Sequence, residues 1–134
     1  MAQHYCITSD GRIVAAIRFT IHETLSDLPH RAIYGDLIAH LPTPVAWISR
    51  LVVDMDRRGE GLSRPLDRLA VSEPFLHGVR SIVGTAGSVL GNRFRHDVML
   101  SHGWMALGNA QGTTDLPLLA VDTPMVYACV GPDR

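Results

Sequence analysis

The sequence predicts one α/β domain whose mostly antiparallel sheet is flanked by helices. β-rich runs recur along all 134 residues, and segments between them carry apolar residues at helical spacing. No repeat, linker or low-complexity segment divides residues 1–134, and a chain of this length can bury roughly two-thirds of its unfolded surface in one core. The expected order of elements is strand, strand, an ambiguous helical segment, strand, helix, strand, helix, strand, strand.

The chain opens with a predicted β-hairpin. Residues 5–8 and 13–21 are two β-rich runs, and Asp10-Gly11 lies between them. An Asp-Gly pair in this position is a strong hairpin signal, because its residues tolerate the positive φ angles of a tight turn. Alternation along the second run places Arg18 on the face away from Ile17 and Phe19.

The next segments are ambiguous. Residues 24–28 carry no clear pattern, whereas apolar residues within 31–41 fit helical spacing. Pro42-Thr43-Pro44 must end any helix there, because proline lacks the N–H that a helix interior needs.

The centre of the chain reads as strand, glycine loop, helix. An apolar run over residues 48–53 breaks into a loop with Gly59 and Gly61, and residues 62–70 then follow the spacing of an amphipathic helix. Two glycines let a backbone turn tightly, so that successive N–H groups and the positive end of the helix dipole point at one place. This geometry suits a phosphate. Arginines in or just after the loop offer matching charge: Arg57, Arg58, Arg64 and Arg68.

The second half of the chain completes the sheet. Ser72-Glu73-Pro74 is expected to close the helix, and residues 79–84 read as a strand. A second helix follows, with two closing strands over residues 104–108 and 118–130. The residues expected on the inner face of that second helix are Leu90, Phe94 and Val98.

Composition sets limits on function. A net charge of -1, with scattered arginines, argues against general nucleic-acid binding. The two cysteines and seven histidines show no metal-ligand spacing, so no metal is expected. Neither an export signal nor an apolar run long enough to span a membrane is present, and we expect a cytoplasmic protein.

The sequence of the loop can be compared with the known phosphate-binding motifs. The chain has no lysine, which excludes a Walker P-loop, and two glycines do not make a dinucleotide fingerprint. Arg58, Gly61 and Ser63 instead resemble the coenzyme A loop of the GCN5-related N-acetyltransferase (GNAT) superfamily, whose pattern is Arg or Gln, two residues, Gly, one residue, Gly or Ala. Ser63 is a small residue outside that pattern.

Two further positions are similar to the superfamily. Asn92 precedes the Gly103-Trp104 pair by the spacing found in its second helix, but Met99 occupies the place of a Tyr that often protonates the leaving thiolate. The likeness begins at the second GNAT strand. It therefore implies a GNAT-like sheet without the usual N-terminal strand and two helices, and an acceptor site that is open, completed by residues 24–44 or completed by another subunit.

A narrower resemblance is to the branch that makes acyl-homoserine lactones and N-acyl amino acids. Arg18 after a Val-Ala-Ala strand, Ser49-Arg50 and Gly103-Trp104 carry it. In that branch an acid normally stands two residues before the Ser-Arg pair, where this chain has Trp47.

The resemblance implies a set of donor contacts. Acetyl-CoA or a longer acyl-CoA would place its pantetheine arm along Leu51, Val52 and Val53, where a backbone N–H would polarise the thioester carbonyl. Asn92 is also expected to contact the donor, unless it merely caps or packs its helix. The loop residues expected to hold the phosphates are Arg58, Gly59, Glu60, Gly61, Leu62 and Ser63.

The chemistry implied is direct attack by an amine, which needs a group to remove its proton. Candidate bases are His22 and Glu23, with Asp54 less favoured because it lies at the start of the loop. Arg50 is either a clamp for substrate or structure, or a strand arginine paired with a surface acid. For Arg18 the surface pair is favoured.

Three functions follow, in order of preference. The first is an acyltransferase acting on a small-molecule amine or amino acid, with coenzyme A or an acyl carrier protein as the donor. The second is a catalytically degenerate domain that binds acyl-CoA or another chain, and the third is an interaction module. We expect a homodimer, because a sheet that lacks its first strand leaves an edge unpaired.

Overall fold

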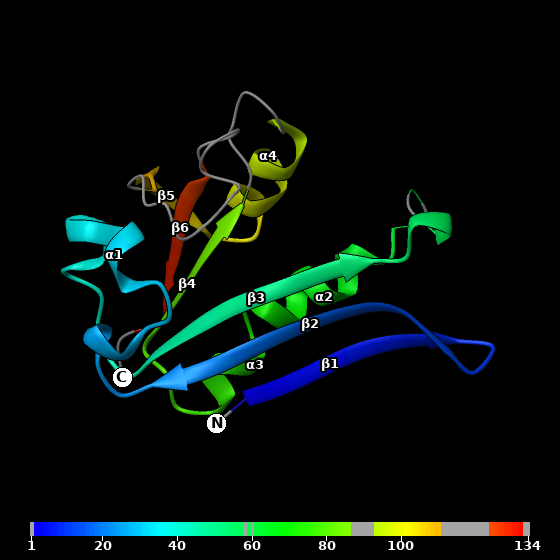
Figure 1. The fold of residues 1–134 in the computed structure, drawn as a ribbon, viewed down its shortest axis with the longest axis horizontal. Coiled ribbons are helices and arrows are strands. Elements are labelled where there is room, and N and C mark those ends of the chain that lie inside the picture. Colours follow the sequence, from blue (N-terminus) through cyan, green and yellow to red (C-terminus); the bar gives the residue numbers. More distant parts are fainter. Residues whose placement is uncertain (1, 58, 60, 87–92, 111–123, 133–134) are drawn as a thin grey trace.

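The computed structural model describes residues 2–57, 59, 61–86, 93–110 and 124–132, with the backbone alone at 50–53 and 55 (Figure 1). Within these residues, six strands form one sheet in the order β1-β2-β3-β4-β6-β5. The pairing of β3 with β4 is parallel, and the others are antiparallel. The predicted α/β class with a mostly antiparallel sheet is confirmed.

The N-terminal half of the sheet is a long meander. β1 (Ala2–Ser9) and β2 (Arg12–His22) form the predicted hairpin, and Asp10 and Gly11 take positive φ angles of 53° and 75° at its turn. Three short helices follow, named η1 (Leu25–Asp27), α1 (Arg31–Tyr34) and η2 (Gly35–Ile38). The ambiguous segment is thus helical but broken into short pieces. β3 (Val45–Val53) then pairs with β2.

The C-terminal half contains the longer helices. After η3 (Met55–Arg57) come α2 (Ser63–Ala70) and α3 (Glu73–Leu76), then β4 (Ser81–Ala86). α4 (Arg93–Ser101), β5 (Met105–Asn109) and β6 (Met125–Val130) complete the described chain. No helix within the described ranges is long and apolar enough to cross a membrane.

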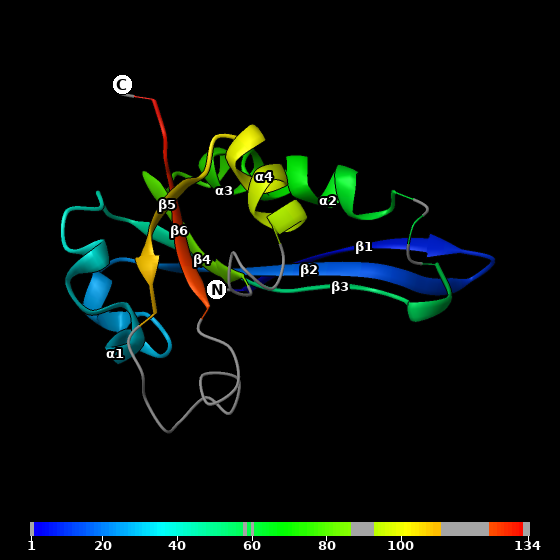
Figure 2. The same ribbon diagram turned by 90° about the horizontal axis from the view of Figure 1, so that it is seen from above.

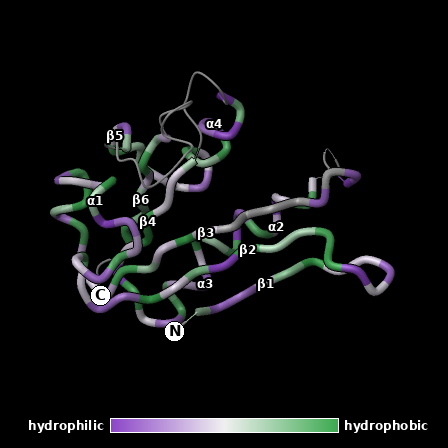
Figure 3. Tube along the Cα trace, viewed as in Figure 1, coloured by the Kyte–Doolittle hydropathy of each residue, from purple (hydrophilic) through white to green (hydrophobic). Residues whose placement is uncertain are grey.

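The helices lie on two sides of the sheet. Figure 2 shows α2, α3 and α4 over one face, which we call the helical face, and α1 on the opposite face. Alternation along the strands separates two buried clusters. Phe19, Ala46 and Ile82 belong to the cluster on the helical face, whereas Val45 and Val83 belong to the cluster beside α1. Unlike these buried strand segments, the tip of the β1–β2 hairpin is hydrophilic (Figure 3).

α2 ends at Ala70, just before the Ser72-Glu73-Pro74 segment expected to close it, and the short helix α3 begins there with Pro74 in its first turn, where its missing N–H is tolerated. One expectation about the helices is wrong. Phe94 is not on the inner face of α4: it is 78% exposed, and Met99 is the buried residue of that helix. Leu90 lies outside the described residues. Leu66 and Ala70 are buried in α2, as its spacing predicts.

An ion pair joins the two main helices of the helical face. The Arg95 guanidinium in α4 donates two hydrogen bonds of 2.8 Å to the Asp67 carboxylate in α2. Asp67 is buried, with 6% of its surface exposed. A forked pair of this kind fixes orientation as well as distance, and it holds α2 against α4.

We expect Arg95→Met to destabilise the protein by about 2 kcal/mol, because it leaves the buried Asp67 carboxylate without the guanidinium. The control is Arg93→Met on the same helix. Arg93 and Asp97 lie 3.4 Å apart, but their side chains are 73% and 62% exposed. That loss should stay below about 0.5 kcal/mol. Urea denaturation would measure both, and equal losses would contradict the role given to Asp67.

Candidate active site

The site forms where β3 and β4 separate. These strands pair only through Val45 with Ser81, Ala46 with Ile82 and Trp47 with Val83. Beyond this point they diverge (Figure 1). Gly84 is the last close neighbour: a Cβ built on it would lie 3.7 Å from the Ile48 carbonyl oxygen. Among the described strands, the rest of β3 therefore has no partner on the β4 side, and its backbone groups on that side are available to a ligand.

A β-bulge reshapes β3 at the same place. Ala16 pairs with Val52 and Arg18 pairs with Ser49, so the single residue Ile17 faces both Arg50 and Leu51. A bulge bends its strand and re-aims local backbone groups. The bend occurs in the unpaired part of β3, next to the point of separation.

The loop after β3 is tied to the hairpin. The Asp54 N–H donates to the Val14 carbonyl at 2.8 Å, and the Asp54 carboxylate pairs with Arg12. The same carboxylate accepts the Asp56 N–H at 3.1 Å. Asp54 is thus engaged in holding the loop, which supports its lower rank as a base.

The glycines of the loop have the predicted conformation. Gly59 and Gly61 have φ angles of 88° and 76°. Such angles are strained for residues with a Cβ. α2 starts directly after Leu62, which makes no capping hydrogen bond. The Arg64 N–H donates to the Gly61 carbonyl at 3.2 Å. The N-terminus of α2, with the positive end of the helix dipole, is suited to an anion. Arg58 and Glu60 lie outside the described residues, as does Asn92.

The candidate bases do not lie where β3 and β4 separate beyond Trp47 and Val83, a place that we call the fork. His22 pairs with Val45, three residues before Ile48, which is roughly 10 Å along the strand. Its Nε2 lies 2.7 Å from the Thr20 hydroxyl, and its Nδ1 lies 3.8 Å from the Asp27 carboxylate. Glu23 follows β2 and is exposed. The structure therefore brings the fork and the glycine loop together along β3, but it does not bring these bases to them.

Aromatic side chains lie beside the fork on the face that carries α1. The rings of Trp47 and His30 are 6.3 Å apart. Burial raises the pKa of Tyr34 to about 12, opposed by a hydrogen bond with Trp47. The buried Tyr34 hydroxyl therefore lies beside the Trp47 indole. No group of three or more metal-binding side chains occurs among the described residues.

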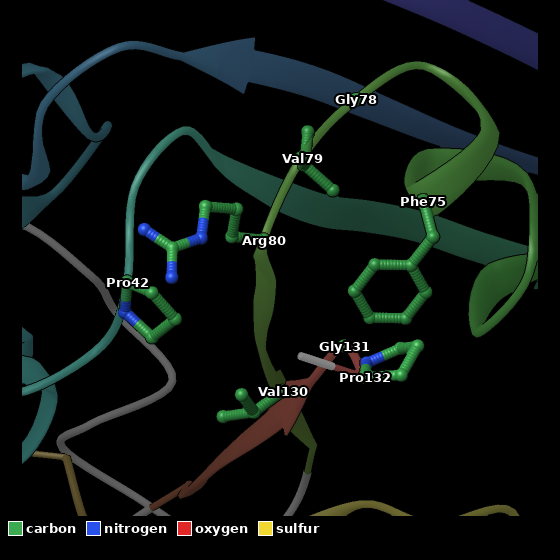
Figure 4. Close-up of a pocket in the computed structure, with 8 residues that line it drawn as sticks. All are labelled: Pro42, Phe75, Gly78, Val79, Arg80, Val130, Gly131 and Pro132. Carbon is green, nitrogen blue, oxygen red and sulfur yellow. The ribbon is translucent and has the colours of Figure 1, made fainter. Parts of the chain in front are cut away.

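A cavity at the other end of β4 is separate from this site. It has a volume of about 390 Å³ and lies beside the start of β4 and the end of β6 (Figure 4). The fork opens toward the opposite end of β4. The residues that line this cavity are Pro42, Phe75, Gly78, Val79, Arg80, Val130, Gly131 and Pro132.

Sequence reasoning missed two polar arrangements. It did not predict the Asp67–Arg95 ion pair. The two residues are 28 positions apart in different helices, and no local spacing indicates that they are in contact. It also favoured a surface acid as the partner of Arg18. The structure instead leaves the Arg18 Nε and the Ser49 hydroxyl buried without a hydrogen bond. Their alternation with buried apolar residues in neighbouring strands is the signal that could have indicated such a site.

No family model matches the sequence, and no curated protein matches it. Similar solved structures exist. An N-acyl amino acid synthase, FeeM, from uncultured soil microbes has a TM-score of 0.69 at 12% identity, covering 96% of this chain and 72% of its own.

Two acetyltransferases are also similar. A ribosomal-protein-alanine N-acetyltransferase from Brucella melitensis has a TM-score of 0.64 at 14% identity, with 95% and 67% of the two chains covered. An acetyltransferase of the GNAT family from Bacillus cereus has a TM-score of 0.59 at 13% identity, with 97% and 71% covered. The likeness is one of fold.

We expect Gly61→Val to abolish coenzyme A binding while leaving the fold intact. A valine at a φ of 76° adds roughly 1–2 kcal/mol of strain, and a Cβ there meets only the Arg64 side chain at 3.8 Å. Gly78→Val is the control, because Gly78 has a φ of 90° at the other end of β4 with open space around it. Calorimetric titration would compare the two, and undiminished affinity in Gly61→Val would refute the loop assignment.

Proposed function

We propose that this chain, which has the fold of the GCN5-related N-acetyltransferases, is an acyltransferase. It moves an acetyl or longer acyl group from a thioester of coenzyme A or an acyl carrier protein to an amine or amino acid. The observation that carries this proposal is the continuity of three features along β3. The fork beyond Trp47, the bulge at Arg50 and Leu51, and the glycine loop before α2 follow one another along a single stretch of chain.

The donor would bind along this stretch. Its phosphates would accept hydrogen bonds from the loop and from the first turn of α2, where the helix dipole favours negative charge. The amide groups of its pantetheine arm would pair with the backbone groups of Leu51, Val52 and Val53 on the side away from β2. A backbone N–H at the bulge would then point at the thioester carbonyl and stabilise the negative charge that develops there.

The reaction would be direct. The amine nitrogen attacks the thioester carbon, a C–N bond forms, the C–S bond breaks and the thiolate leaves. Much of the rate would come from holding both reactants in place. A base must take one proton from the acceptor ammonium, and His22 or Glu23 remain the predicted groups. Arg50 remains a predicted clamp.

The leaving thiolate has no side-chain donor at position 99. Met99 is 6% exposed and packs with Ile82, Trp104 and Tyr127 in the core. A thioether cannot donate a proton. We infer that solvent or the proton of the attacking amine protonates the thiolate, which needs little help because an ordinary thiol has a pKa of about 8.5.

The alternative is a domain that binds acyl-CoA or another protein without turnover. Two observations favour it: Met99 lies in the core, and His22 is paired at the closed end of the fork. Release of free thiol from acyl-CoA in the presence of amines, with calorimetric titration of the same donors, separates the two. Binding without thiol release supports the alternative, and absence of binding supports an interaction module.

We expect the acyl-transfer rate to rise with pH and then to reach a plateau. The rise reflects loss of a proton from the acceptor or its base, and no fall near pH ~10 is expected because no tyrosine acid occupies position 99. His22→Gln should lower the rate at neutral pH more than at high pH, where the amine loses its proton unaided. Glu23→Gln is the matched test of the second candidate. A fall in rate near pH 10 would contradict solvent protonation.

We also expect a homodimer. Both β1 and β5 lie at edges of the sheet, and unpaired edges are normally covered or blunted. The exposed positions of β1 are Ala2, His4, Cys6 and Thr8, so any contact through that face would be largely polar. Sedimentation equilibrium at micromolar concentration should give twice the 14.7 kDa mass. A single 14.7 kDa species would count against a dimer.

A further inference from the structure

Two buried polar groups in the sheet have no hydrogen-bond partner among the described residues. The Arg18 Nε and the Ser49 hydroxyl oxygen are buried, and neither makes a hydrogen bond in the part of the chain that the structure describes. Buried polar atoms are almost always hydrogen-bonded, because leaving one unpaired forfeits its hydration without compensation. Two such atoms in adjacent positions indicate that a molecule from outside the chain forms their hydrogen bonds.

These two residues are directly opposite each other. Arg18 in β2 pairs with Ser49 in β3. Ile17 and Phe19 flank Arg18 and are buried on the helical face, as is Ala46 in β3. By alternation the Arg18 and Ser49 side chains therefore point to the opposite face, where α1 lies. Both residues are only half-buried overall, so a small molecule can reach them.

The pair lies beside the proposed reaction centre. Ser49 is two residues beyond Trp47, the last residue of β3 that pairs with β4, and it directly precedes the bulge at Arg50 and Leu51. On the other side of β2, His4 of β1 pairs with Arg18 and carries no negative charge. The two residues opposite Arg18, His4 in β1 and Ser49 in β3, carry no carboxylate, and Arg18 is adjacent to the fork.

The chemistry of the pair selects an anion. A guanidinium is always charged and presents planar N–H donors that match the two oxygens of a carboxylate. The serine hydroxyl can donate a further bond to the same group. The donor phosphates would bind at the loop and α2, on the helical face and beyond the far end of β3. An anion at Arg18 on the other face must therefore belong to the second substrate.

We propose that Arg18 and Ser49 bind the carboxylate of the acceptor, so that the enzyme selects amines that carry a carboxylate group over amines that lack one. This inference rests on the proposed acyl transfer. Binding of the carboxylate would hold the acceptor on the α1 face next to Trp47, with its amine directed at the fork. The two residues act as specificity-determining contacts and take no part in proton transfer.

The first experiment compares acceptors that differ by one group. Amino acids and their decarboxylated amines are each assayed with acyl-CoA by thiol release. We expect kcat/KM to be at least about 100-fold higher for the amino acids. Equal rates with both series would overturn the carboxylate site while leaving acyl transfer established.

The second experiment changes the pair itself. Arg18→Met should raise KM for amino acids by about 100-fold, leave KM for the plain amines unchanged and erase the preference between them. Ser49→Ala should raise KM about tenfold in the same direction. Arg80→Met is the control, since Arg80 is an exposed arginine at the far end of β4, and it should change neither series.

A third measurement tests the site without turnover. Calorimetric titration of amino acids into the protein should show binding that is lost in Arg18→Met, whose melting temperature should not fall because an unpaired buried group has been removed. Binding that depends on Arg18 with no thiol release would support the site and refute acyl transfer. Unchanged amino-acid binding by a folded Arg18→Met protein would refute the site.

Discussion

The separation of β3 from β4 is the constraint on which the rest of the structure depends. A sheet normally satisfies its backbone groups by pairing each strand on both sides. Here the parallel pairing ends after Trp47 and Val83, and the bulge at Arg50 and Leu51 turns β3 aside. Within the part of the chain that the structure describes, β3 thus keeps a row of strong donors and acceptors without a strand partner on the β4 side, and the other features of the candidate site are arranged around that row.

Contacts outside the fork stabilise the strands and helices that form it. Arg12 and Asp54 fix the loop to the hairpin at one end of β3, and Arg95 holds Asp67 so that α2 cannot rotate away from α4. On the other face, Trp47 is held by Tyr34 and lies near His30. The donor and acceptor would therefore reach the fork from opposite faces, each guided by its own set of fixed groups.

Local patterns predicted most of the fold. Asp10-Gly11 predicted the hairpin, because a tight hairpin turn needs residues that tolerate positive φ angles. The spacing of Leu66 and Ala70 predicted α2, because an amphipathic helix buries one stripe of its surface. Phe94 was misplaced because hydrophobicity alone does not tell which stripe of a helix faces the sheet when Arg95 is drawn inward by Asp67. The site was predictable only where it is continuous in sequence. The loop and β3 form one continuous stretch that a local pattern can propose as a site, whereas the Arg18 and Ser49 pair depends on strand register, which no local pattern reports.

The order of the strands along the chain has a consequence for how the protein folds. β1, β2 and β3 follow one another within the first 53 residues and pair only with their neighbours in sequence, so this half of the sheet needs short loop closures. β4 pairs with β3 over only three residues, and most of its pairing is with β6, which lies far along the chain: Ala86 pairs with Met125 and Ser81 with Val130. The half of the sheet formed by β1, β2 and β3, which carries Arg18, can therefore form early. The half formed by β4, β5 and β6 pairs later, through contacts between residues far apart in sequence. Pulsed hydrogen exchange should protect the Phe19 amide before that of Ile82, and the reverse order would exclude this route.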